Sequence, residues 1–309
     1  MFRKFAPLLG AAAACALLSS CFGGGSSTPT PSPTPTPTGT PTPTPTATPT
    51  PTLTVFDFTK AFTDTVANAS YIYAYFTPTS GGGETWSDGS RVGGSSKITY
   101  AISPDSAAFT FPDAASLMTF GAADLQTATP TLRAYRNGTE ALTLELPFQH
   151  VLRASYERKQ SFTLNTVPGT LRSTRVTLFY NEVSTADAIT TNLSYTGTAQ
   201  VAGGKPGTAV QAFTSPASTF TVTASDKKIT GSIQIIETVG GVATVRAVLP
   251  ISATLAADGS FTGAIDDTAN GFKGTFVGAL AGPSREEVFL IFNVAHTDGR
   301  EFIGSYIGT

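Results

Sequence analysis

The chain has 309 residues and a formal net charge of −2, and only 13% of its residues are charged. This balance gives no global basis for binding nucleic acid or an acidic membrane surface. The length allows one or two domains. Glycine, threonine, serine and alanine abound, which favours strands and turns over long helices.

Residues 1–20 have the pattern of a secretory signal peptide. Arg3 and Lys4 form the charged region, and Phe5 to Leu18 form the apolar core. That core is too short for a comfortable transmembrane span. The sequence therefore predicts export.

The signal ends in Leu18-Ser19-Ser20-Cys21, which resembles the lipobox of bacterial lipoproteins. The resemblance implies cleavage before Cys21 and acylation of that residue, with fatty acids such as palmitate. Several acyl chains hold a protein firmly to a bilayer. Phe22, rather than Asp, follows the cysteine and favours the outer membrane by the same resemblance. The alternative is an ordinary signal peptide with a chance cysteine.

Residues 21–52 form the second predicted segment, a lipid-anchored disordered tether. From Thr28 to Thr52 the chain is almost pure Pro-Thr repeat, which cannot bury a core and favours polyproline II. At about 3.1 Å per residue this stretch reaches roughly 80 Å. We interpret it as a stalk that lifts the folded part away from the membrane; the alternative is an unselected linker.

Residues 53–186 are predicted to form an N-terminal β-rich domain. Phe56 to Asn68 is compatible with either a helical turn or the start of a strand. Ser80 to Ser96 is rich in glycine and predicts a loop that carries Trp86. Asn137-Gly138 lies between two alternating runs and predicts a hairpin. Further strands are expected at Tyr71–Phe76, Ile98–Phe111, Val151–Phe162 and Val176–Tyr180.

Residues 187–309 are predicted to form a C-terminal β-barrel domain. Strict alternation from Leu193 onward indicates strands with one buried face. Asp258-Gly259 and Asn270-Gly271 are strong turn signals. Glycines share the apolar face with aromatic residues, an arrangement that lets a strand coil while a ring covers the gap. The fold class we expect is all-β, with a small soluble antiparallel β-barrel of about eight strands after a second strand-rich segment.

A set of short motifs follows a fixed order along the chain: Leu193–Ala199, the Phe220 strand followed by Ile229–Ile233, Phe261–Gly263, Gly271–Gly278, Gly282–Phe289 and Gly299–Gly308. This order resembles the β-barrel domain of transferrin-binding protein B-like surface lipoproteins. The resemblance covers about Leu193 to Thr309. It departs from the family pattern where Ala279-Leu280-Ala281 is inserted before Gly282-Pro283, and where Val288 replaces a glycine pair.

The resemblance implies an outer-membrane lipoprotein on the cell surface that binds a ligand. The missing catalytic motifs predict that it is not an enzyme. The implied partners are membrane lipid through acylated Cys21, an outer-membrane transporter, and haem, an iron-bearing molecule or another solute. The sequence also allows a location on the periplasmic face of the outer membrane. It also leaves open a structural or adhesive envelope protein without a small ligand, and an integral outer-membrane barrel with an apolar belt.

Four aromatic residues are the candidate ligand-binding residues. Tyr71, Tyr73 and Tyr75 line one face of a predicted strand and could stack on a ligand or coordinate ferric haem. A packed strand face is the alternative interpretation. Trp86 could anchor a ligand from its loop or cap one end of the barrel.

We expect no catalytic residues, no metal site and no cofactor. The nucleophile-elbow, zinc-protease and phosphate-loop motifs are all missing from the sequence. His150 and His296 lack metal-ligand spacing. Asp266-Asp267 suggests a hairpin turn rather than a calcium loop. The stretch from Arg133 to Arg175 is rich in basic residues, and either an anion-binding patch or scattered surface charges would explain it.

Overall fold

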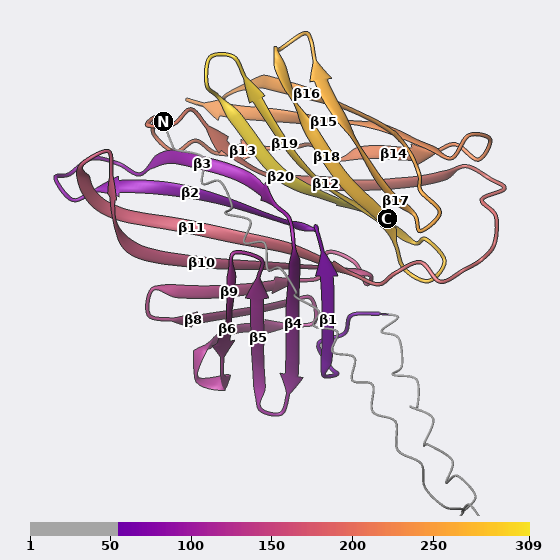
Figure 1. Ribbon diagram of the computed structural model, residues 1–309, viewed down its shortest axis with the longest axis horizontal. Coiled ribbons are helices and arrows are strands. Elements are labelled where there is room, and N and C mark those ends of the chain that lie inside the picture. Colours follow the sequence, from indigo (N-terminus) through magenta and orange to yellow (C-terminus); the bar gives the residue numbers. More distant parts are fainter. Residues whose placement is uncertain (1–54) are drawn as a thin grey trace, which may run out of the picture. The chain divides into compact units, whose positions relative to one another are not determined.

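Antiparallel sheets make up residues 55–309, the part of the chain that the computed structural model describes (Figure 1). This confirms the expected all-β antiparallel class. The described residues belong to one compact unit, and no helix among them is long and apolar enough to cross a membrane. The predicted signal peptide, Cys21 and the tether lie outside these residues.

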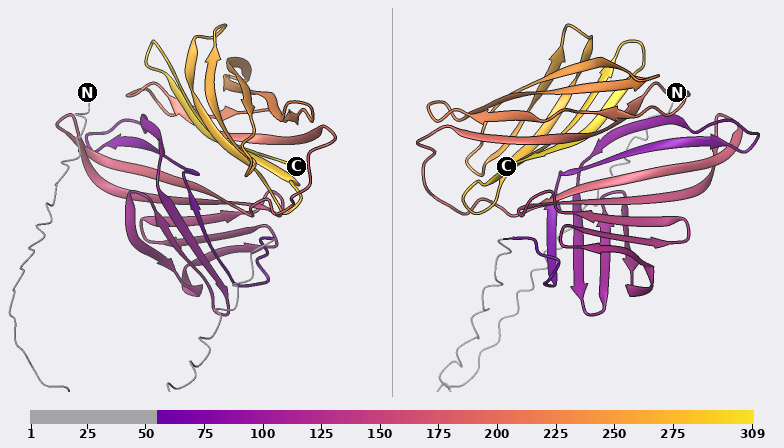
Figure 2. Two further views of the ribbon diagram at one scale, coloured as in Figure 1. Left: turned by 45° about the vertical axis from the view of Figure 1, so that its right-hand side comes forward. Right: turned by 180° about the vertical axis from the view of Figure 1, so that it is seen from behind.

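A four-stranded sheet, in the order β1-β4-β5-β6, contains the first strand of the described chain. The segment around Phe62, for which helix and strand were both open, is strand β1. The strands of this sheet run across β8 (Leu132–Asn137), β9 (Glu140–Glu145) and β10 (Val151–Leu164) (Figures 1 and 2). Phe109 packs against Tyr156 and Phe179. The strands of the four-stranded sheet are β1 (Phe62–Ala67), β4 (Ser95–Ile102), β5 (Asp105–Phe111) and β6 (Ala114–Phe120).

A seven-stranded sheet has the order β3-β2-β11-β10-β9-β8-β7. The predicted loop at Ser80 to Ser96 is wrong in its middle part, because β3 occupies Thr85–Val92 and pairs with β2. The predicted hairpin at Asn137-Gly138 is confirmed as β8 and β9. The strands are β2 (Ser70–Pro78), β3 (Thr85–Val92), β7 (Leu125–Thr129), β8 (Leu132–Asn137), β9 (Glu140–Glu145), β10 (Val151–Leu164) and β11 (Val167–Tyr180); a 3-10 turn, η1 (Ala122–Asp124), precedes β7.

A nine-stranded sheet contains every strand after β11. Apart from the two-residue β13, its strands follow one another as a meander, and the last strand, β20, pairs with the first, β12. The strands are β12 (Leu193–Gly204), β13 (Phe213–Thr214), β14 (Ser218–Val222), β15 (Lys228–Val239), β16 (Val242–Thr254), β17 (Ser260–Asp267), β18 (Phe272–Ala281), β19 (Glu287–His296) and β20 (Glu301–Gly308).

The curled nine-stranded sheet is not closed into a complete barrel, because β16 and β17 share no ladder among the described strands. At this seam Val248 N–H donates to the Asp267 carboxylate at 2.7 Å instead of to a carbonyl of β17. Backbone groups of alternate residues point to the same side of a strand, so Pro250 also faces β17, where it has no N–H to donate. The seam is therefore held by a side chain.

The inside of this sheet is filled by side chains, as expected for about eight strands. Its buried cluster includes Phe220, Phe276, Phe292 and Tyr306. The expected pairing of glycines with rings is confirmed. A Cβ placed on Gly231 would lie 2.6 Å from the Phe220 ring, and the pairs Gly263–Phe276, Gly278–Phe261 and Gly304–Phe292 are equally close packed.

Replacing a ring-covered glycine should destabilise the fold. In Gly231→Ala the new methyl group collides with Phe220, which is fully buried, and we expect a loss of about 1–3 kcal/mol in the free energy of unfolding. Gly83→Ala is the matched control, because a Cβ there meets nothing within 4 Å. Urea denaturation measures both variants, and equal midpoints would contradict this account of the glycines.

Candidate functional site

The structure brings the four candidate aromatic residues together as one cluster, the Tyr-Trp cluster. Tyr71 and Tyr73 lie with ring centroids 6.3 Å apart, and Tyr73 stacks on Trp86 at 6.3 Å. Tyr75 meets Trp86 edge to face at 5.4 Å. The strand that carries the tyrosines has a bulge between Ala74 and Tyr75, and bulges re-aim side chains.

The members of the Tyr-Trp cluster differ in solvent exposure and in the groups they contact. Trp86 is only 1% exposed, so the expectation of an exposed anchor in a loop is wrong. Its indole N–H donates to Glu301 Oε1 of β20 at 2.7 Å. Tyr75 is buried beneath the Arg172 guanidinium, 4.4 Å from the ring centroid. Both residues therefore serve packing. Tyr71 is as deeply buried, at 2% exposure, so Tyr73 is the one member of the cluster that is partly exposed.

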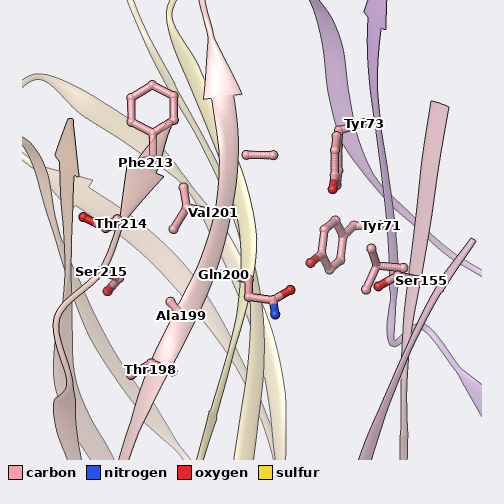
Figure 3. A pocket seen from close by; sticks show the side chains of 12 residues that line it. Tyr71, Tyr73, Ser155, Thr198, Ala199, Gln200, Val201, Phe213, Thr214 and Ser215 are labelled. Carbon is pink, nitrogen blue, oxygen red and sulfur yellow. The ribbon is translucent and has the colours of Figure 1, made fainter. Parts of the chain in front are cut away.

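Tyr71 and Tyr73 line a groove with a volume of about 510 Å³, the β12 groove. It lies where β2, β10 and β11 of the seven-stranded sheet approach β12 and β13. Figure 3 shows the two tyrosines on one side of β12 and Phe213, Thr214 and Ser215 on the other. The remaining lining residues are Ser155, Val176 and Thr198–Ala202.

No lining residue of the β12 groove is charged. Hydroxyl groups come from Tyr71, Tyr73 and Ser155 on one side and from Thr198 and Ser215 on the other, and Gln200 contributes an amide. Gln200 Nε2 also donates to Glu145 Oε2 at 3.1 Å. The groove thus offers hydrogen bonds and aromatic surface without a charge partner.

Both groove tyrosines keep their protons at neutral pH. Burial raises the pKa of Tyr71 to about 12, and burial also raises the pKa of Tyr73. A tyrosine that coordinates ferric iron does so as phenolate, which these surroundings disfavour. Tyr73 is therefore suited to donating a hydrogen bond, whereas the Tyr71 hydroxyl already lies 3.2 Å from Ser305 Oγ.

Glu301 is one of the ionisable groups at the junction between the two larger sheets; Glu145, which accepts from Gln200, is another. Burial raises the pKa of Glu301 to about 7, against the hydrogen bond from Trp86, while the charge of Asp88 raises it further. Next to it, Tyr71 Oη and Ser305 Oγ lie 3.2 Å apart, and Asn293 Nδ2 donates to Gly89 O at 3.3 Å. The two larger sheets are therefore joined by polar contacts besides the Trp86–Glu301 bond.

The Asp266-Asp267 turn and the basic stretch from Arg133 to Arg175, which the sequence also singled out, make hydrogen bonds and ion pairs within the protein. Within residues 55–309 no group of three or more His, Cys, Asp and Glu side chains is placed to hold a metal ion. Asp267 accepts hydrogen bonds from Asn270, as in a hairpin turn. The basic stretch is mostly paired: Arg133 with Asp105, Arg153 with Glu145, Arg158 with Glu140, Arg172 with Glu84, and Arg175 with Asp113.

Sequence reasoning missed the β12 side of the groove. Thr198 and Gln200 stand on the polar face of a strand that was correctly expected, but nothing in the alternation says which partner that face meets. Glu301 was missed for the same reason. The one signal in the sequence is that Glu301 directly precedes the last run of alternating apolar residues.

No protein-family model matches the chain, and no curated protein matches it. Among solved structures it is similar to the isotype 1 transferrin binding protein B of serogroup B Neisseria meningitidis, with TM-score 0.43 and 13% identity over 77% of this chain and 43% of that one. A transferrin binding protein B mutant from Haemophilus parasuis Hp5 gives TM-score 0.42 and 10% identity over 77% and 45%. The chain spans less than half the length of these proteins.

Stability should fall as the pH rises through the titration of Glu301. An ordinary glutamate in the unfolded chain loses its proton near pH 4.5, whereas folded Glu301 keeps it to about pH 7. Between pH 4.5 and about 7 the folded state holds a proton on Glu301 that the unfolded state has lost. The free energy of unfolding therefore decreases as the pH rises through this range. After screening by solvent, we expect a loss of roughly 1–2 kcal/mol over this range.

Thermal unfolding from pH 4.5 to 8 measures this effect. Glu301→Gln should remove this part of the pH dependence, because the amide still accepts from Trp86 and never ionises. The control is built in, since the other raised carboxyls, Asp64 and Glu287, are the same in both proteins. Superimposable profiles would exclude Glu301 as the cause.

Proposed function

We propose that the protein is a non-enzymatic ligand-binding module on the cell surface, held to the outer membrane through acylated Cys21 and the Pro-Thr tether. The observation that carries the proposal is the β12 groove. It gathers two of the aromatic residues expected from the sequence with hydroxyl and amide groups from β12 and β13.

The place of the groove supports a binding role. The inside of the curled sheet is packed with rings, so a ligand has no room there. The groove lies outside the curled sheet, where the nine-stranded sheet meets the seven-stranded sheet. Residues that converge from distant parts of the chain on one concavity are the usual form of a binding site.

The chemistry of the groove favours a ligand with uncharged polar groups. Neutral phenols, hydroxyls and one amide provide donors and acceptors, and the rings provide stacking area. Haem and ferric iron, which the resemblance implies, fit less well because both tyrosines hold their protons. Transfer of the captured molecule to an outer-membrane transporter remains part of the proposal.

Blocking the groove should abolish binding. We would test the mature chain, with Cys21→Ser to prevent acylation, by calorimetric titration against haemin, ferric citrate, neutral oligosaccharides and uncharged peptides. Gln200→Trp places a bulky side chain in the groove, since Gln200 is exposed and faces Tyr71 (Figure 3), and should weaken binding at least tenfold.

Thr196→Trp is the matched control, because Thr196 is exposed on the same face of β12 but does not line the groove. It should leave affinity unchanged. Binding that survives Gln200→Trp would move the site elsewhere. Absence of binding by the whole panel would favour the structural or adhesive alternative.

Protease treatment of intact cells tests the location. We expect an antibody against residues 53–309 to lose its signal in intact cells, because the tether would hold this part outside. Lysed cells are the control for cleavability. Loss of signal only after lysis would place the folded part in the periplasm and overturn the surface proposal.

A further inference from the structure

Residues 181–192 connect β11 to β12 and contain no strand or helix. This linker passes one end of the curled sheet (Figure 1), beside the turns that join β14 to β15 and β16 to β17. The Ser184 and Thr185 N–H groups both donate to Pro283 O, at 3.1 and 2.9 Å. The linker is therefore fixed against that end of the sheet.

A pocket with a volume of about 240 Å³, the linker pocket, lies between the linker and the curled sheet. Its apolar wall consists of Val183 and Ile189 from the linker and of Leu255 and Leu280 from the opposite side. Leu280 belongs to the buried core of the curled sheet, and the other three side chains pack against that core. The linker pocket shares no lining residue with the β12 groove, so the two are separate concavities.

Two cationic side chains, Lys227 and Arg285, also line the linker pocket. Lys227 Nζ donates to Ile189 O at 2.6 Å and to Ala224 O. Arg285 Nη2 donates to Asp187 O at 2.7 Å. Two of these bonds end on linker carbonyls that are two residues apart. Both cationic groups therefore reach the same short stretch of the linker.

The two cations have free hydrogen-bond donors and no anionic partner. Within residues 55–309 no ion pair joins Lys227 or Arg285 to a carboxylate. An ammonium group has three N–H donors and a guanidinium group has five, and their bonds to the neutral carbonyls use only part of them. Asp187 is the third charged residue of the lining, so the side chains around the pocket carry one net positive charge.

We propose that the linker pocket binds a small monocarboxylate with a short aliphatic chain. The carboxylate accepts hydrogen bonds from Lys227 and Arg285, a charge-assisted contact that the planar guanidinium favours. The chain packs against Val183, Leu255 and Leu280 and removes apolar surface from water. This site goes beyond the proposed function, since it lies outside the β12 groove.

The lining and the volume together define the ligand. A fully polar anion would leave the aliphatic wall uncovered, and a neutral hydrocarbon would leave the cations without a partner. A water molecule takes up about 30 Å³ in the liquid, so on that scale the pocket has room for roughly eight non-hydrogen atoms. Hexanoate, with six carbons and two oxygens, has this size.

Titration of hexanoate into the isotope-labelled mature chain, with Cys21→Ser to prevent acylation, tests the site by the chemical shifts of the backbone amides. We expect saturable shifts at millimolar hexanoate for amides around Leu255 and Leu280. Hexanamide has the same size without a charge and should bind at least tenfold more weakly. Octanoate should bind no better than hexanoate, because its two further carbons find no room.

Substitution of either cation should weaken the binding of hexanoate at least tenfold. Lys227→Met and Arg285→Met each remove one charge and keep a long side chain. Lys228→Met is the matched control, because Lys228 is the next residue, is exposed and does not line the pocket. It removes the same charge and should leave affinity unchanged. If Lys227→Met fails to fold, Arg285→Met and the comparison with hexanamide still decide.

Three results would overturn the inference: no binding of hexanoate, equal binding of hexanamide, or binding that survives both substitutions. The β12 groove is tested separately, since Gln200→Trp should leave the binding of hexanoate unchanged. Failure at the linker pocket therefore leaves the proposed function intact. Conversely, if hexanoate binds as expected but the whole ligand panel fails at the groove, the proposed function falls and the linker pocket stands.

Discussion

Strand β20 is buried on both faces, and the two halves of the described chain depend on it. On its inner face Phe302 and Tyr306 fill the curled sheet, and the Tyr306 hydroxyl donates to the carbonyls of Tyr195 and Ser218. On its outer face Ile303 packs against the seven-stranded sheet near Gly89. Each fully buried side chain of this kind contributes about 1.5–3 kcal/mol, so a change in β20 acts on both sheets.

The tight curl of the nine-stranded sheet decides where ligand chemistry can occur. Glycines let the strands bend, and rings such as Phe220 and Phe276 occupy the space that side chains would have taken. The result is an interior without a cavity for a ligand. Recognition is therefore left to the outside of the sheet and to its junction with the seven-stranded sheet.

Local patterns predicted most strands and turns, because alternation and turn dipeptides act over a few residues. Asp258-Gly259 and Asn270-Gly271 turn as expected, with φ of 81° and 76° at the glycines. Strand β3 was missed because the run from Ser80 to Ser96 has the composition of a loop, and only pairing with β2 makes it a strand. The tyrosines could be nominated from their stripe, but their groove could not, since its other wall comes from residues more than a hundred positions later.

The β12 groove and the junction are physically coupled. Glu301 lies opposite Gly204 at the end of the β12–β20 ladder, and Trp86 lies opposite Tyr75 in the β2–β3 ladder. The hydrogen bond between these two side chains thus joins the β12–β20 strand pair to the β2–β3 strand pair that bears the tyrosines. Backbone hydrogen bonds join the same parts, because Trp86 N–H donates to Thr208 O and Gly207 N–H donates to Trp86 O, each at 2.9 Å. The tyrosines are therefore held beside β12 by backbone pairing of β3 together with the Trp86–Glu301 contact.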